Sequence, residues 1–155
     1  MNTISLLHNI GAYVRNLAAS AFTSIIAGGA GNGVLVVGNT VDRLDPNNGS
    51  LSLSVLFSII ASATLAATKT LSIMTVTIEH SPDGVNWSTY LTPTAPGVVS
   101  TGAGTIVTST SIAADLVDAF RYVRLKWTPT LSNTATDTAT ILAAATLAGT
   151  DRLPA

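Results

Sequence analysis

Apolar and polar residues alternate with a period of two along much of this chain. From Leu51 to Ile59 the apolar residues take every second position, and serines fill most of the others. Val123, Leu125 and Trp127 alternate with polar residues, and alanine, isoleucine and leucine alternate with threonine between 138 and 147. Successive side chains of a β-strand point to opposite faces, so the pattern predicts strands with one drier and one wetter face.

Turn-forming residues separate these segments. They are rich in glycine, proline, asparagine and aspartate, and lie at 28–33, 45–49, 82–84 and 93–97. Short strands between such turns, with no long helical pattern among them, are typical of antiparallel sandwiches and barrels. We therefore predict an all-β fold, an antiparallel β-sandwich with jelly-roll topology, as a single domain over residues 1–155.

The N-terminal residues 1–20 fit two patterns. Leu6, Ile10, Val14 and Leu17 would share one face of a helix, whereas Ile4, Leu6, Ile10, Ala12 and Val14 suit a strand. We favour an extended arm or an edge strand for this segment.

Charged residues are scarce, which argues against nucleic acid and membranes as partners. Charged residues make up 10% of the chain and the net charge is −1, so the sequence offers no basic stripe for nucleic acid or for a membrane surface. The mean hydropathy of +0.49 raises the question of a membrane span, and residues 46–68 carry no charge. That stretch opens with a turn and then alternates serine with apolar residues, which indicates a strand instead. No membrane or nucleic-acid partner is expected.

The sequence contains no recognisable catalytic or metal-binding motif. There is no cysteine, and the two histidines, His8 and His80, are far apart. No G-x-S-x-G elbow or phosphate-binding glycine pattern occurs. We expect no cofactor, no metal and no enzymatic activity.

The segment EHSPDGVNWSTY, residues 79–90, combines a turn with two aromatic residues. Pro82, Asp83 and Gly84 favour a tight reversal, so the flanking residues are expected to form a β-hairpin. Trp87 would then cover the open end of the core. Alternatively, Trp87 and Tyr90 would form an aromatic platform for a sugar or a partner protein. With so few aromatic residues available to fill a core, covering the core is the favoured interpretation.

A second segment, AFRYVRLKW at 119–127, gathers three of the seven basic residues. Tyr122, Arg124 and Lys126 fall on one face of the predicted strand. They are candidates for contact with an acidic partner surface. They could equally form a charged edge strand that discourages aggregation.

Several short motifs together resemble a known class of viral proteins. These are NTVDRL (39–44), SPDGVNW (81–87), FRYVRL (120–125), LSNTATDTA (131–139) and the terminal GTDRLPA (149–155). In this order, and with the DRLPA ending, they resemble capsid decoration, or cement, proteins from the head-morphogenesis regions of tailed bacteriophages. The resemblance extends from about residue 30 to the end of the sequence.

The resemblance implies a small β-sandwich or jelly roll, often trimeric, on the outside of the mature shell at its local threefold positions. The implied partner is the major capsid protein, and the implied location is the outer surface of the virion after synthesis in the host cytoplasm. Two alternatives remain open at this stage: a tail-tube or head–tail connector protein, and a carbohydrate-binding β-sandwich module that uses Trp87 and Tyr90.

Overall fold

A computed structural model describes residues 14–47, 49–132 and 136–150 of the chain. Within these ranges the regular structure is entirely β. The strands are β1 (Arg15–Ala18), β2 (Thr23–Ile26), β3 (Val36–Val37), β4 (Val41–Asp42), β5 (Ser52–Ser81), β6 (Ser88–Leu91), β7 (Gly97–Asp115), β8 (Tyr122–Leu131) and β9 (Thr138–Thr150). All pairings between them are antiparallel, as predicted for an all-β fold.

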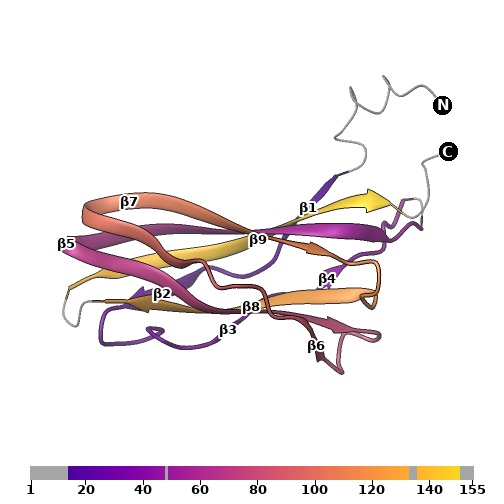
Figure 1. The fold of residues 1–155 in the computed structure, drawn as a ribbon, viewed down its shortest axis with the longest axis horizontal. Helices are drawn as coiled ribbons and strands as arrows, with labels where there is room; N and C mark the ends of the chain where they lie inside the picture. Colours follow the sequence, from indigo (N-terminus) through magenta and orange to yellow (C-terminus); the bar gives the residue numbers. More distant parts are fainter. Residues whose placement is uncertain (1–13, 48, 133–135, 151–155) are drawn as a thin grey trace, which may run out of the picture.

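The sheet folds back on itself to give two facing layers (Figure 1). Strand β5 belongs to both: residues 52–64 pair with β9, and residues 71–81 pair with β8. One layer has the order β1 and β2, then β9, β5 and β7, and we call it the β9 layer. The β8 layer has the order β3 and β4, then β8, β5 and β6, and the start of β7 pairs with β5 further along the same edge as β6. This order is that of a jelly roll, so the predicted sandwich is confirmed.

Irregular backbone marks the fold line between the layers. The register between β5 and β7 shifts between Leu65 and Lys69, where Thr68 adopts a positive φ of 64°. On β7 the bend falls at Gly102 and Gly104, which both have positive φ and lack the Cβ that would oppose it. Both strands therefore pass from one layer to the other without a loop.

The core lies between the layers and follows the predicted alternation. Val55, Phe57 and Ile59 point inward from β5, and Val123, Leu125 and Trp127 point inward from β8. The inward side chains of β9 are mostly alanine, which lets the two layers approach closely. The inner faces thus explain why a chain so rich in small residues forms a packed core.

The N-terminal prediction is confirmed in part. Residues Arg15–Ala18 form an edge strand on β9, while residues 1–13 lie outside the described residues. None of the described residues belongs to a helix that could cross a membrane. The uncharged stretch that raised that question lies mainly in β5.

Candidate functional site

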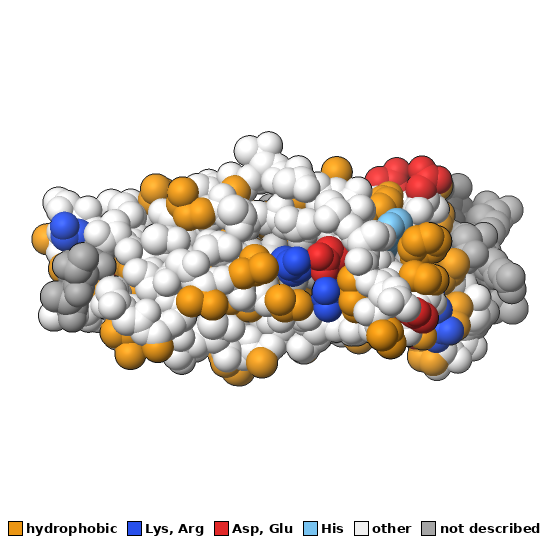
Figure 2. Space-filling model, turned by 90° about the horizontal axis from the view of Figure 1, so that it is seen from below, with side chains coloured by type: hydrophobic (Ala, Val, Ile, Leu, Met, Phe, Trp, Pro, Cys, Tyr) orange, Lys and Arg blue, Asp and Glu red, His pale blue; other side chains and the backbone are white. Residues whose placement is uncertain are grey.

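The predicted contact residues Tyr122, Arg124 and Lys126 share the outer face of the β8 layer, as their spacing indicated. The structure adds a partner that the sequence did not reveal. Glu79, opposite Arg124 on β5, receives Arg124 Nη2 at 2.6 Å and Lys126 Nζ at 2.8 Å. Figure 2 shows the resulting patch of mixed charge near the middle of this face. The carboxylate therefore engages two of the three candidate contact side chains.

The environment of Glu79 keeps it ionised at neutral pH. Burial alone would raise the pKa of this carboxyl, but hydrogen bonds from Lys126 and Arg124, together with their charges, outweigh burial and lower the pKa. With two cations around one anion, the cluster keeps a single net positive charge. It is therefore a weaker electrostatic target for an acidic partner than three basic residues in the sequence suggested.

Trp87 extends this cluster. The Arg124 guanidinium carbon lies 4.1 Å from the centroid of the Trp87 ring, a cation–π contact. The indole Nε1 donates to the carbonyl of Gly84 at 3.2 Å, which holds the ring against its own turn. One face of the Trp87 ring is therefore occupied by a side chain of the same protein.

Tyr90 lies in a different environment from Trp87. Its hydroxyl donates to the carbonyl of Asp115 at 2.9 Å, and its ring is 5.1 Å from that of His80. Tyr90 packs against the core, and the fully buried tryptophan is Trp127. Trp87 and Tyr90 thus have different contacts, and of the two it is Tyr90 that packs against the core.

The predicted hairpin forms between β5 and β6, and its turn is fixed by Asp83. This carboxylate accepts hydrogen bonds from the backbone N–H groups of Val85 and Asn86, each at 2.8 Å, and from the Ser81 hydroxyl, also at 2.8 Å. These bonds hold the pKa of Asp83 well below its usual range, with the backbone bond from Asn86 the largest cause. The turn is therefore rigid, and it positions Trp87 over the β8 layer.

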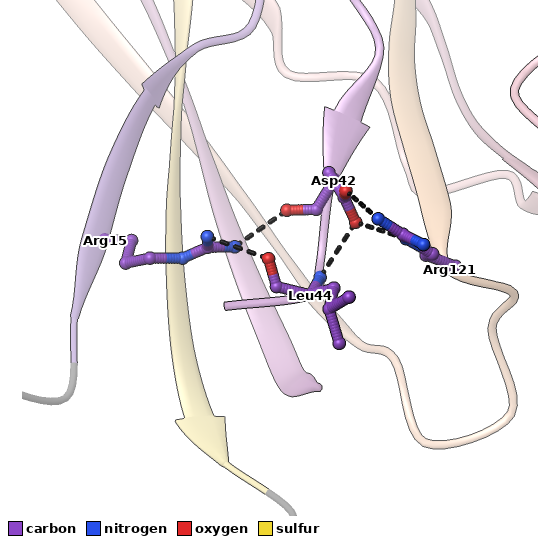
Figure 3. Close-up of polar contacts among 4 residues, drawn as sticks. All are labelled: Arg15, Asp42, Leu44 and Arg121. Atoms are coloured by element: carbon purple, nitrogen blue, oxygen red, sulfur yellow. Dashed lines mark hydrogen bonds and ion pairs between the residues drawn. The ribbon is translucent and has the colours of Figure 1, made fainter. Parts of the chain in front are cut away.

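A second charged group ties the two layers together at one corner (Figure 3). Arg15 on β1 donates to the carbonyls of Asp42, at 2.7 Å, and Leu44, at 2.9 Å. The Asp42 side chain receives both Nε and Nη2 of Arg121, at 2.9 and 2.7 Å. The hydrogen bond from Arg121 is the main cause that lowers the pKa of Asp42. These residues line a hollow of about 360 Å³.

The spacing patterns of the sequence do not single out this corner, although its residues lie in the motifs that carry the resemblance. Asp42 and Arg43 belong to NTVDRL, and Arg121 belongs to FRYVRL. The Arg43 side chain is almost fully buried and donates to the carbonyls of Ala119 and Phe120. The two motifs are therefore in contact, and the scarcity of charge in this chain was a usable signal that these arginines and this aspartate have structural partners.

The outer face of the β9 layer has the opposite character. It carries no charged side chain along residues 56–64 of β5 and the residues paired with them, and Asp115 lies beyond this region at the end of β7. Its side chains are small, hydroxylated or aliphatic, and the strand registers place them together. They are Asn16, Ala18, Ser24 and Ile26 on β1 and β2; Thr138, Thr140, Leu142, Ala144 and Thr146 on β9; Leu56, Ser58, Ile60, Ser62 and Thr64 on β5; and Thr105, Val107, Ser109, Ser111 and Ala113 on β7. We call this set the uncharged face.

An apolar hollow opens in the uncharged face where the chain leaves β1 and enters β2. It has a volume of about 380 Å³, and Ala18, Phe22, Leu142 and Ala144 contribute to its lining. Phe22 is 75% exposed at its rim. A hollow of this size can receive one large apolar side chain.

No set of three or more His, Asp or Glu side chains within the described ranges is arranged to hold a metal ion. The charged side chains of both clusters are paired with one another or with main-chain groups.

The chain was compared with known families and structures. No family model matches it, and no curated protein matches it. A solved structure of infectious bursal disease virus, Gx strain, matches with a TM-score of 0.49 and 11% identity, covering 90% of this chain and 33% of that chain. The T13 particle of the same virus matches with a TM-score of 0.49 and 14% identity, covering 87% and 30%.

The CBM22-1 and GH10 modules of xylanase 10B from Clostridium thermocellum match with a TM-score of 0.32 and 15% identity, covering 92% of this chain and 27% of that chain. The chain thus spans about a third or less of the length of these structures. These likenesses assign no activity, ligand or partner to this chain.

Proposed function

We propose that this chain is a structural virion protein that binds the outer surface of a bacteriophage capsid and stabilises the expanded shell. The order of the sequence motifs suggests this class of protein. The observation that carries the proposal is the uncharged face of the β9 layer, because an exposed sheet face without charge is suited to burial against another protein.

The physical argument rests on desolvation. Burying a charged side chain is costly unless it is paired, whereas hydroxyl, alanine and aliphatic side chains lose little when water leaves. The patch has four rows about 4.8 Å apart, with β1 and β2 sharing one row. Each row spans about nine residues at about 3.3 Å per residue, which gives a patch of roughly 19 by 30 Å. That is large enough to form a substantial part of a standard protein interface.

The apolar hollow beside Phe22 supplies a place for specificity. Binding energy in interfaces concentrates at a few apolar or aromatic side chains that fill pockets near the centre of the contact. In this proposal an apolar side chain of the major capsid protein enters the hollow, and the flat sheet around it excludes water.

Stabilisation of the shell then follows from mass action. A protein that binds only the expanded arrangement of capsid subunits lowers the free energy of that arrangement relative to the precursor. The proposal includes homotrimers at local threefold positions of the outer surface. It also keeps Tyr122, Arg124 and Lys126 as a smaller, polar contact with a neighbouring subunit. No catalytic step is involved.

The test is cosedimentation of the purified protein with cognate heads that lack it, using precursor and expanded shells in parallel. Saturable binding to expanded shells alone, near one trimer per local threefold position, is the expected result. Equal binding to both shells, or to neither, would overturn the proposal. Hexameric rings of the purified protein would instead favour a tail-tube or connector role.

A further inference from the structure

Strand β7 forms an unusual edge of the β9 layer. It pairs with β5 on one side, and along 104–115 none of the described strands pairs with its other side. Edge strands are normally protected by charge, proline, bulges or interruption, because their open main-chain groups can pair with another chain. The stretch Gly104–Ala114 contains neither a charged residue nor a proline.

The other described edges are protected. On the opposite side of the same layer, β1 and β2 are separated by residues 19–22, and Arg15 lies at the start of β1. In the β8 layer the edge strands β3 and β4 are two residues each, and β6 has four. The long, uninterrupted and uncharged edge is therefore specific to β7.

The hydrogen bonds identify which main-chain groups of β7 are open. The N–H of Leu116 donates to the carbonyl of Leu53 at 2.8 Å, so residue 116 points toward β5. The main-chain N–H and C=O groups of successive residues point to alternate sides of an antiparallel strand. Those of the even-numbered residues in this stretch therefore bond to β5, and those of the odd-numbered residues point away from it. Asp115 follows this rule, since its carbonyl accepts from the Tyr90 hydroxyl and not from β5. The open positions are residues 105, 107, 109, 111 and 113.

The even-numbered residues of this edge are symmetric about Ser109. When they are read outward in both directions, Thr108 matches Thr110 and Ile106 matches Ile112. Antiparallel pairing of two such strands about Ser109 places Thr108 opposite Thr110 and Ile106 opposite Ile112, with side chains of the same layer face together. On the outer face Val107 lies opposite Ser111, and Thr105 lies opposite Ala113. Aliphatic pairs and threonine pairs of this kind stabilise neighbouring strands.

We propose that β7 pairs with β7 of a second copy of this chain, antiparallel and with the twofold axis at Ser109. Every open N–H and C=O from residues 105 to 113 then finds a partner, which gives about ten main-chain hydrogen bonds. Ile106 lies opposite Ile112 of the partner subunit, on the inner face. A twofold contact of this kind is self-complementary and closes after two copies.

The pairing joins the two β9 layers into one sheet of twice the width. Because the axis is perpendicular to the sheet, both uncharged faces lie on the same side and form one continuous surface. The contact uses the edge of β7 and leaves both outer faces accessible. It forms without a shell, and it is compatible with a separate threefold contact through another surface.

The absence of cysteine from the chain allows a sharp test by cross-linking. In the proposed register residue 109 faces its own copy with Cα atoms about 5.5 Å apart, which suits a disulfide. We expect S109C to form a covalent dimer under mild oxidation. The control V107C lies about 14 Å from its own copy, so it stays reduced, although Val107 is 74% exposed. The double variant V107C/S111C should cross-link again.

A second measurement does not depend on disulfide geometry. S109P removes an N–H that points away from β5, so the fold should persist while the sedimenting mass falls relative to wild type. T110P removes an N–H that bonds to β5 and should instead lower the melting temperature. Equal cross-linking of S109C and V107C, no cross-linking of S109C, or an unchanged mass for S109P would each overturn the proposal. Failure of shell binding alone would leave the pairing intact, because both tests use the purified protein.

Discussion

The two layers share an inner pattern and differ on their outer faces. On the β8 layer Glu79, Arg124 and Lys126 form a compact ionic cluster, with Trp87 stacked on one guanidinium. On the β9 layer the outer face has no charged side chain along residues 56–64 of β5 and the residues paired with them. The alternation of inward-facing apolar residues determines how the chain folds, whereas the outward-facing residues determine which surfaces each layer can bind.

This difference bears on the simplest expectation from charge. In a chain with few charged residues, the basic strand attracts attention as a contact surface. Yet its cations are largely matched by a carboxylate of the same subunit, and a partner would have to compete with Glu79 for them. The face without charge requires no such competition, and desolvating it is inexpensive.

The largest expected effect comes from placing a charge on the uncharged face. Ser62 is exposed on β5, and Ser62→Lys should weaken binding to expanded shells by about 100-fold, because the ammonium group would be buried without a partner. Unfolding free energy should change by no more than about 0.5 kcal/mol. The control, Lys126→Ala, alters the other face. Normal binding by Ser62→Lys with lost binding by Lys126→Ala, in the same cosedimentation assay, would reverse the roles of the faces.

Removing the carboxylate of the ionic cluster should affect stability instead. In Glu79→Gln, Arg124 and Lys126 remain adjacent and about three-quarters buried without a counter-charge. We expect the unfolding free energy to fall by about 2 kcal/mol, a value between those for surface and buried ion pairs. Urea unfolding measures it. Charge-neutral Thr77→Val on the same face is the matched comparison, and an equal loss there would show that the ionic contacts contribute nothing specific.

Acid should act on the same cluster. The pKa of Glu79 is lower in the folded protein than its ordinary value of 4.5. A depressed folded pKa contributes stability that is present above the unfolded value and is lost as the pH falls through the folded value. The unfolding free energy should therefore fall below about pH 4.5, and less steeply in Glu79→Gln than in wild type. Parallel acid profiles would contradict this assignment.

The hollow in the uncharged face offers a smaller change. Phe22→Ser removes the exposed ring at its rim and should weaken shell binding by about tenfold, or about 1.4 kcal/mol. Because this side chain is 75% exposed, thermal unfolding should be nearly unchanged. Binding equal to wild type would place the shell contact away from the hollow.

The smallest effect is expected at Trp87. Trp87→Ala removes the cation–π contact with Arg124 and should lower the unfolding free energy by about 1 kcal/mol, while shell binding is preserved. Glycan-array binding can be measured on the same variant. A specific glycan signal in wild type that disappears in Trp87→Ala, with the fold intact, would support the carbohydrate-binding alternative.

Much of the fold could be predicted from alternation alone, but the length of β5 could not. The inward positions are odd-numbered from Val55 to Ile73 and even-numbered at Val76 and Ile78. A register irregularity between Ile73 and Val76 causes this change. Because the alternation changes phase there, one strand of 30 residues resembles two strands in the sequence. The bend at Thr68 itself is not marked by any turn-forming residue.

For the candidate sites, the arrangement within one strand could be predicted from the sequence, but the contacts between strands could not. Local spacing placed Tyr122, Arg124 and Lys126 on one face, because that depends only on strand periodicity. Their partner Glu79 is 45 residues from Arg124 in sequence, and only the pairing of β5 with β8 brings them together. The uncharged face likewise depends on five strands whose registers no single segment specifies.

The position of β9 has a consequence for how the protein folds during synthesis. This strand follows all the others in the chain, yet it lies between β1 and β5 in the middle of its layer, with Arg15 opposite Leu147. The ribosome must therefore release β1 and β5 long before their shared neighbour exists. Such distant pairings close slowly, on a scale of milliseconds to seconds. Until β9 inserts, two strand edges stay open to other nascent chains, so slow translation or crowding at that stage should promote aggregation.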